Sequence, residues 1–191
     1  MYALSIQTHS HLFTHALLDV VLSGVFRSSF PRSKNTAFLK CLNLKSVVSL
    51  VLEDYPTALV DFYDKSGTEL ITLGIEGNKG AFKEIDIVDF NAVMRTVMDE
   101  SKRPLLIHCN KGKHRTGCIV GCIRRLRGWA VSAIVDEYML FAFPKPRQED
   151  QRFIEAFSCD DFYDSFSAIP DEDCETLGDK GSDDCLKLTI V

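Results

Sequence analysis

Two kinds of apolar pattern alternate along the chain, short continuous runs and longer periodic ones. The continuous runs predict buried strands at residues 24–29, 46–51, 69–75 and 105–108. Apolar residues three or four positions apart predict helices at residues 36–42, 56–64, 86–100, 116–127, 132–141 and 149–157. This alternation favours an α/β fold, in which a mostly parallel central sheet of about four to five strands is flanked by helices.

The length of 191 residues fits one domain with a single core. We predict an N-terminal extension at residues 1–20, the domain at residues 21–157 and a disordered tail at residues 158–191. The tail holds ten acidic residues against two lysines, a net charge of −8, which leaves +3 for the rest of a chain whose total is −5. High charge without periodicity is typical of disorder. The tail is either a solvating segment or an autoinhibitor of a domain that handles polyanions.

The composition is that of a soluble globular protein, with 46% hydrophobic and 26% charged residues. The apolar stretch at residues 16–26 contains Asp19, is too short to span a bilayer and follows no basic segment. Seven cysteines form an odd set without the spacing of a disulfide framework. We therefore expect a cytoplasmic protein, or one also found in the nucleus, with no membrane span and no nucleic-acid partner.

Residues 108–117, with the sequence HCNKGKHRTG, stand between a predicted strand and a predicted helix. Loop amides that converge at a helix N-terminus bind anions. Cys109 lies at the base of this loop, where the helix end and nearby cations lower a thiol pKa from ~8.5, so we expect a thiolate nucleophile. The amides of residues 110–115 would bind phosphoryl oxygens, and Arg115 would add a bidentate contact. The stretch therefore predicts cysteine-based chemistry on a phosphate.

Other residues of the stretch have expected supporting roles. Gly112 allows tight curvature, and Gly117 lets the helix start pack closely on the sheet. Thr116 can donate its hydroxyl to the sulfur of Cys109 when the thiolate leaves. His108 can orient the loop through a ring N–H.

The stretch resembles the signature of the cysteine-based protein tyrosine and dual-specificity phosphatase superfamily. Further segments resemble the plant and fungal atypical dual-specificity phosphatases, namely FRSSFPR at residues 26–32, GIEGNK at 74–79, DEY at 136–138 and FAFPK at 141–145. The similarity covers residues 21–157. It implies a cysteine phosphatase fold, and the branch it points to includes inositol pyrophosphate phosphatases.

The predicted site has more than one candidate for the general acid. Relatives that cleave ordinary phosphoesters use an Asp on a loop upstream of the nucleophile, and here residues 74–83 contain Glu76 but no Asp. Glu76 is the tentative acid; it can equally orient Lys79 or cap the following loop. Asp86 is a weaker candidate because it fits the start of a helix.

A missing acid bears on the choice of substrate. A phosphoester expels an alkoxide, whose conjugate acid is about as weak as water at ~15.7. A phosphoanhydride expels a phosphate with a conjugate-acid pKa of about 6, which departs with little protonation. Pyrophosphate cleavage therefore tolerates a weak acid better than phosphoserine cleavage does.

Basic residues around the loop favour a substrate that bears many phosphates. Each of them alone is also compatible with a solvated surface charge, and Lys83 is the weaker candidate on the facing loop. The predicted substrate-binding residues are Asn110, Lys111, Gly112, Lys113, His114, Asn78, Lys79, Lys145 and Arg147.

The remaining candidates have simpler interpretations. His9, His11 and His15 lack nearby Cys or carboxylate partners, so we expect neither metal nor cofactor. Cys122 reads as a core residue, and a disulfide that joins Cys109 to a cysteine of its helix has little support. Surface charges or structural ion pairs are expected for Arg124, Arg125 and Arg127. Arg27 either buttresses the catalytic loop or lies at an ordinary strand edge.

The leading hypothesis is a cysteine phosphatase that cleaves the β-phosphate of an inositol pyrophosphate through a phosphocysteine intermediate. The alternatives are a protein tyrosine or dual-specificity phosphatase, whose partner is a phosphoprotein, and an inactive module that binds phosphorylated ligands.

Overall fold

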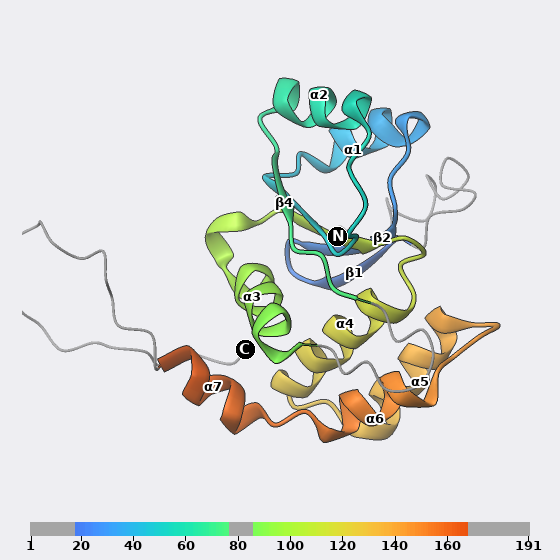
Figure 1. Ribbon diagram of the computed structural model, residues 1–191, viewed down its shortest axis with the longest axis vertical. Coiled ribbons are helices and arrows are strands. Elements are labelled where there is room, and N and C mark those ends of the chain that lie inside the picture. Colours follow the sequence, from blue (N-terminus) through green and yellow to red (C-terminus); the bar gives the residue numbers. More distant parts are fainter. Residues whose placement is uncertain (1–17, 77–85, 168–191) are drawn as a thin grey trace, which may run out of the picture. The chain divides into compact units, whose positions relative to one another are not determined.

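The computed structural model describes residues 18–76 and 86–167 of the chain (Figure 1). The chain divides into two compact units, residues 1–159 and 160–191. The first unit holds the sheet and helices α1 to α6, and helix α7 (Cys159–Ser167) begins at the boundary. No helix in the described ranges is long and apolar enough to cross a membrane.

A five-stranded sheet lies at the centre of the first unit, in the order β1-β2-β5-β3-β4. All neighbouring strands are parallel except β1, which pairs antiparallel with β2. The predicted mostly parallel α/β fold is therefore confirmed. The strands are β1 (Asp19–Leu22), β2 (Val25–Ser29), β3 (Ser46–Ser49), β4 (Glu69–Thr72) and β5 (Leu105–Cys109).

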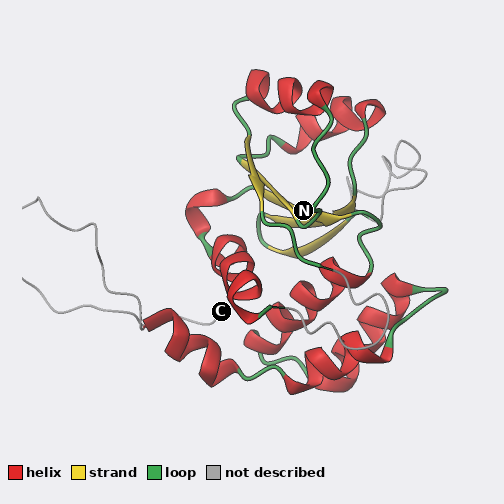
Figure 2. Ribbon diagram, in the orientation of Figure 1, coloured by secondary structure: helices red, strands yellow, loops and turns green. Residues whose placement is uncertain are grey.

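Helices cover both faces of this sheet (Figure 2). On one face, Leu39 of α1 and Leu59 of α2 form a core cluster with Val47 of β3 and Leu106 of β5. On the other face, α3 packs on β3, α4 packs on β5, and α5 and α6 pack against α4. The helices are α1 (Thr36–Leu42), α2 (Thr57–Ser66), α3 (Ile87–Met98), α4 (His114–Leu126), α5 (Val131–Ala142) and α6 (Gln148–Ala156), with short 3-10 helices η2 (Ser33–Asn35) and η3 (Glu100–Lys102).

Strand β5 explains why the central run reads as continuously apolar. All five of its residues are buried, because helices cover both of its faces. Its carboxyl end carries His108 and Cys109, so the central, fully buried strand of the sheet leads directly into the predicted loop.

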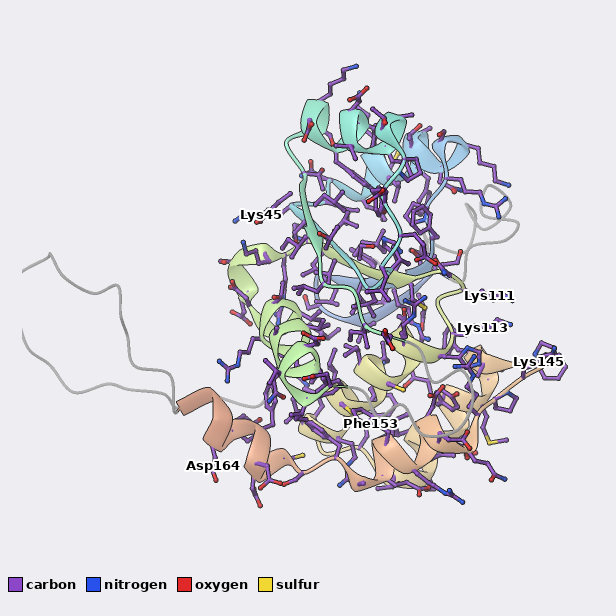
Figure 3. All side chains as sticks on the ribbon, viewed as in Figure 1. Lys45, Lys111, Lys113, Lys145, Phe153 and Asp164 are labelled. Carbon is purple, nitrogen blue, oxygen red and sulfur yellow. The ribbon has the colours of Figure 1, made fainter. Side chains whose placement is uncertain are left out.

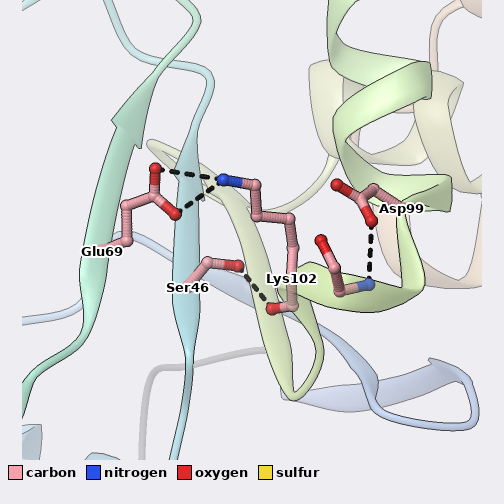
Figure 4. Close-up of polar contacts among 5 residues, drawn as sticks. Ser46, Glu69, Asp99 and Lys102 are labelled. Carbon is pink, nitrogen blue, oxygen red and sulfur yellow. Dashed lines mark hydrogen bonds and ion pairs between the residues drawn. The ribbon is translucent and has the colours of Figure 1, made fainter. Parts of the chain in front are cut away.

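Surface contacts join the residues just before β5 to β3 and β4, at the end of the sheet away from Cys109 (Figure 4). The Nζ atom of Lys102 lies 2.8 Å from Oε2 of Glu69 on β4, and Oγ of Ser46 donates to the carbonyl of Lys102 at 2.8 Å. Nearby, the carboxylate of Asp99 accepts a hydrogen bond from the amide of Ser101 at 2.8 Å. Exposed ion pairs contribute little stability each, so these contacts chiefly fix the entry of the chain into β5.

Regular elements lie in both segments that were predicted to flank the domain. Strand β1 begins at Asp19, inside the predicted N-terminal extension, and a turn at Gly24 with φ of 74° pairs it with β2. Helix α7 occupies the start of the predicted tail, because Asp160 and Asp161 lie in its first turn, where acidic side chains favour a helix. Residues 168–191 lie outside the described residues, so the prediction of disorder there stays a prediction.

Candidate active site

The predicted loop lies at the carboxyl edge of the sheet, where parallel strands place ligand sites. Strand β5 ends at Cys109, and helix α4 begins at His114. The side chain of Cys109 is only 3% exposed. Chain segments that leave β2, β3 and β4 surround the loop, as the contacts of Gly112 and Arg115 show.

Gly112 lies directly against the end of β2. Its φ is +65°, and an added Cβ would lie 2.5 Å from the carbonyl oxygen of Ser28 and 2.7 Å from the amide nitrogen of Ser29. Only glycine fits both this backbone conformation and this close approach. The predicted need for glycine is therefore confirmed, and the neighbouring strand adds a second reason for it.

Arg115 is held in place by two backbone carbonyls. Its Nη1 donates to the carbonyl of Leu50, after β3, at 2.6 Å and to that of Ile75, after β4, at 3.0 Å. These bonds occupy one edge of the guanidinium and fix its plane. The other edge, formed by Nε and Nη2, has the geometry for a bidentate contact with an oxyanion.

His108 contacts Tyr55, a partner that the sequence did not predict. Its Nε2 lies 2.8 Å from the hydroxyl of Tyr55, and the ring of Phe30 packs edge-on at a centroid distance of 5.1 Å. Burial lowers the pKa of His108 to about 4, so the ring is neutral at pH 7. A hydrogen bond with the backbone of Cys109 partly opposes the effect of burial on this pKa. The ring therefore contacts both the segment after β3 and the residue that begins the loop.

Two residues at the start of α4 have informative surroundings. The hydroxyl of Thr116 is buried and has no hydrogen-bond partner among the described residues, and its donation to the departing sulfur of Cys109 stays a prediction. At Gly117, an added Cβ would lie 2.9 Å from the ring of Tyr138. The small residue therefore allows α4 to approach α5 rather than the sheet.

Lys113 and His114 hold the segment between α5 and α6. The ammonium of Lys113 donates to the carbonyl of Phe143, and Nε2 of His114 lies 2.8 Å from the carbonyl oxygen of Lys145. Figure 3 shows Lys111, Lys113 and Lys145 on the same side of the first unit. Of these three, Lys111 and Lys145 are exposed.

A buried hydrogen-bond chain supports the same segment from below. The hydroxyl of Tyr138 donates to Oδ2 of the buried Asp150 at 2.6 Å and accepts a bond from the amide of Arg147 at 3.2 Å. Asp150 has no signal in the sequence, because a lone Asp near the start of a helix has no local sign of burial. These hydrogen bonds fix the backbone that carries Lys145 and Arg147.

Carboxylates near the loop include one that the sequence analysis missed. Glu76 is exposed and follows Ile75, whose carbonyl binds Arg115. Glu53, also exposed, accepts a bond from the side-chain amide of Asn110 at 3.4 Å. A bond from its own backbone amide, the bond from Asn110 and the charge of Arg115 lower the pKa of Glu53, which makes it a poor proton donor. Asn78, Lys79 and Lys83 lie outside the described residues.

The structural interpretations of several other residues are confirmed. Asp86 caps α3 by accepting a 2.8 Å bond from the amide of Val88. Arg124 forms a bidentate pair with Glu137, with both distances at 3.0 Å. Cys118 and Cys122 are free and buried, and burial raises the pKa of both thiols. Within the described ranges, no group of side chains is arranged to hold a metal ion; the three N-terminal histidines lie outside those ranges.

Comparisons with known proteins agree with this geometry. The chain is 44% identical over 142 residues to inositol diphosphatase SIW14 of Saccharomyces cerevisiae, an alignment that covers 74% of this chain but half of the yeast protein. It is 42% identical over 138 residues to inositol diphosphatase DSP4 of Arabidopsis thaliana, with 72% of this chain and 70% of that protein covered.

Solved structures give the same result. The SIW14 catalytic core superposes with a TM-score of 0.74 at 42% sequence identity, and the match covers 78% of this chain and 89% of that chain. The sequence profile described as "Tyrosine phosphatase family" matches residues 17–172, most of the chain. With the nucleophile loop, the arginine and the sheet arranged as above, the chain belongs to the tyrosine phosphatase family.

Proposed function

We propose that the chain is a cysteine-dependent phosphatase that removes the β-phosphate of inositol pyrophosphates. The observation that carries the proposal is the arrangement of Cys109 at the base of a loop whose closing residue, Arg115, is fixed by two strand-end carbonyls. Proteins similar over about 70% of the chain are named inositol diphosphatases. The matched part of the chain spans half the length of the yeast protein.

The reaction divides into two displacements. The thiolate of Cys109 attacks the terminal phosphorus, the S–P bond forms, and the electron pair of the breaking P–O bond passes to the bridging oxygen. Water then attacks the phosphocysteine, the sulfur regains its electron pair, and orthophosphate leaves. Arg115 and the loop amides hold the equatorial oxygens, so neither step needs a metal or cofactor.

The acids near the loop favour an anhydride over an ester. His108 is neutral and buried, and Glu53 keeps a lowered pKa, so neither holds a proton for an alkoxide at pH 7. Glu76 is still the candidate for the general acid. A phosphate leaving group, with its conjugate-acid pKa of about 6, departs without strong proton donation.

The basic residues around the loop support a substrate with several phosphates. Lys113 and His114 bind carbonyls of the segment that carries Lys145 and Arg147, which fixes those two cations beside the loop. We propose that Lys111, Lys145 and Arg147 contact the outer phosphates. Lys113 and His114 act mainly by holding the segment between α5 and α6 in place. Asn110 and Gly112 contribute loop amides, and Asn78 and Lys79 remain proposed contacts on the facing loop.

The second candidate is a protein tyrosine phosphatase that acts on a phosphoprotein. The family description favours it, as does a Dictyostelium discoideum relative, 33% identical over 141 residues and described as a probable tyrosine-protein phosphatase. Either function uses a thiolate and so requires a reducing compartment, for which we propose the cytoplasm or the nucleus.

Trapping of the intermediate tests the proposal. The protein is mixed with a diphosphoinositol polyphosphate, quenched in acid and digested, and the peptide that contains Cys109 is examined by mass spectrometry. We expect a phosphate on Cys109 and release of one orthophosphate per substrate. Cys109→Ser should bind the substrate and release nothing. Orthophosphate release by the Cys109→Ser variant would overturn the mechanism.

A further inference from the structure

Arg27 lies beneath the catalytic loop, almost completely buried. It comes from β2, is 1% exposed, and its Nη2 donates to the carbonyl of Gly112 at 2.9 Å. The centre of its guanidinium lies 3.9 Å from the ring centroid of Phe141 on α5. Arg27 thus connects a strand and a helix to the residue at which the loop turns most sharply.

Two carboxylates, Glu137 and Asp19, act on the buried charge of Arg27. Glu137 has the larger effect, yet both of its oxygens are bound by Arg124, and Asp19 is the β1 residue that pairs with Arg27 across the sheet. The Nε of Arg27 has no hydrogen-bond partner in the described part of the chain. Burial nevertheless outweighs both carboxylates and lowers the pKa of Arg27, so this charge is costly to the fold, which indicates a functional reason for it.

Two groups interact electrostatically with Cys109, namely Arg27 from β2 and Cys118 from α4. Arg115 lies in the first turn of α4, at the other end of the loop that Cys109 begins. His108, on β5, is neutral because burial lowers its pKa to about 4, and burial likewise keeps Cys118 protonated. Burial lowers the pKa of Arg27 only to about 10, so it is charged at neutral pH.

We propose that Arg27 is a positioning residue for the nucleophile. By binding the carbonyl of Gly112 it keeps that oxygen away from the anion site, so that the loop amides face the phosphate. Its buried positive charge also favours the thiolate of Cys109. This role rests on the cysteine chemistry proposed above but not on the identity of the substrate.

Alkylation of Cys109 tests the role without any substrate. The rate of reaction with iodoacetamide is measured from pH 4 to 9 by mass spectrometry of the peptide that contains Cys109, and its midpoint gives the thiol pKa. Arg27→Met should raise this midpoint by about one pKa unit or more. Arg27→Lys, which keeps the charge, should have a midpoint close to that of the native protein. Phe141→Leu, which removes only the ring, should leave the midpoint near that of the native protein.

Turnover of a small aryl phosphate gives the second readout. Arg27→Met should lower kcat by about 100-fold with a smaller change in KM, because the loop amides are displaced. Circular dichroism establishes whether each variant folds. If Arg27→Met does not fold, the test is made with Arg27→Lys. An unchanged midpoint in a folded Arg27→Met protein, or equal midpoints for the Met and Lys variants, would overturn the proposal. Failure to cleave pyrophosphates, with the midpoint shifted as expected, would overturn the proposed function alone.

Discussion

The hydroxyl of Tyr55 lies 2.8 Å from Nε2 of His108, which joins the segment after β3 to the residue before the nucleophile. Both groups are neutral at pH 7, because burial raises the pKa of Tyr55 and lowers that of His108 to about 4. The pair is therefore an uncharged brace within an aromatic cluster that also includes Phe30. We therefore expect it to fix the end of β5 rather than to transfer a proton.

Loss of the Tyr55 hydroxyl should destabilise the fold. Tyr55→Phe leaves Nε2 of His108 buried without a partner, which costs about 1–3 kcal/mol. Urea unfolding of Tyr55→Phe, His108→Asn and the double variant measures the coupling between the two side chains. A coupling free energy near zero would show that the contact contributes nothing.

Stability should fall in mildly acidic solution because of His108. In the unfolded chain this histidine binds a proton near pH 6.5, whereas the folded protein takes it up only near pH 4. Its contribution is therefore complete above pH 6.5 and disappears as the pH falls toward 4, a loss of about 3 kcal/mol.

Unfolding of the native protein and of His108→Asn at several pH values isolates this effect from the titration of carboxylates. The difference in unfolding free energy between the two proteins should shrink as the pH is lowered from 7 to 4. A difference that is independent of pH would contradict the neutral, buried state of His108.

Gly112 should tolerate no side chain. Gly112→Ala places a Cβ 2.5 Å from the carbonyl oxygen of Ser28, so the loop must move and turnover should fall by about 100-fold. Gly128 is a matched control, because its φ of +73° is similar but nothing lies within 4 Å of the added atom. Gly128→Ala should cost about 1–2 kcal/mol of stability and leave turnover intact. Equal effects on turnover would refute the argument from close approach.

Lys113 and Lys111 should differ although they are two residues apart. Lys113→Met removes the bond to the carbonyl of Phe143, so amide hydrogen exchange in residues 143–147 should become faster and KM for a polyphosphate should rise. Lys111→Met should raise KM, by removing a charge, without any change in exchange there. If both variants leave the exchange of that segment unaltered, the bond from Lys113 to the carbonyl of Phe143 does not hold the segment in place.

Sequence patterns predicted the elements better than the contacts between them. The continuous apolar run of β5 and the periodic face of α4 were correctly predicted, since local burial determines both patterns. The roles of Tyr55 and Lys113 depend on partners 53 and 30 residues away, and no local pattern encodes such pairs. Of the two roles predicted for Arg27, the bond to the carbonyl of Gly112 supports the buttress of the loop. Lys113 was expected to bind substrate because a lysine that caps a carbonyl has the same sequence signature as a free one.

The edges of the fold were predicted less well for a similar reason. Strand β1 contains Asp19, and its pairing with β2 through the turn at Gly24 decides its structure more than its apolar content does. Helix α7 carries three aspartates and so resembles a disordered segment in composition. In both cases charge concealed a regular element.

The most direct test of the central claim compares two substrates. Release of phosphate from a diphosphoinositol polyphosphate and from a phosphotyrosine peptide is measured under the same conditions, with Cys109→Ser as the blank. The proposed function predicts a higher kcat/KM for the diphosphoinositol polyphosphate and no release by Cys109→Ser. A higher kcat/KM for the phosphotyrosine peptide would contradict it and would identify the chain as a protein phosphatase.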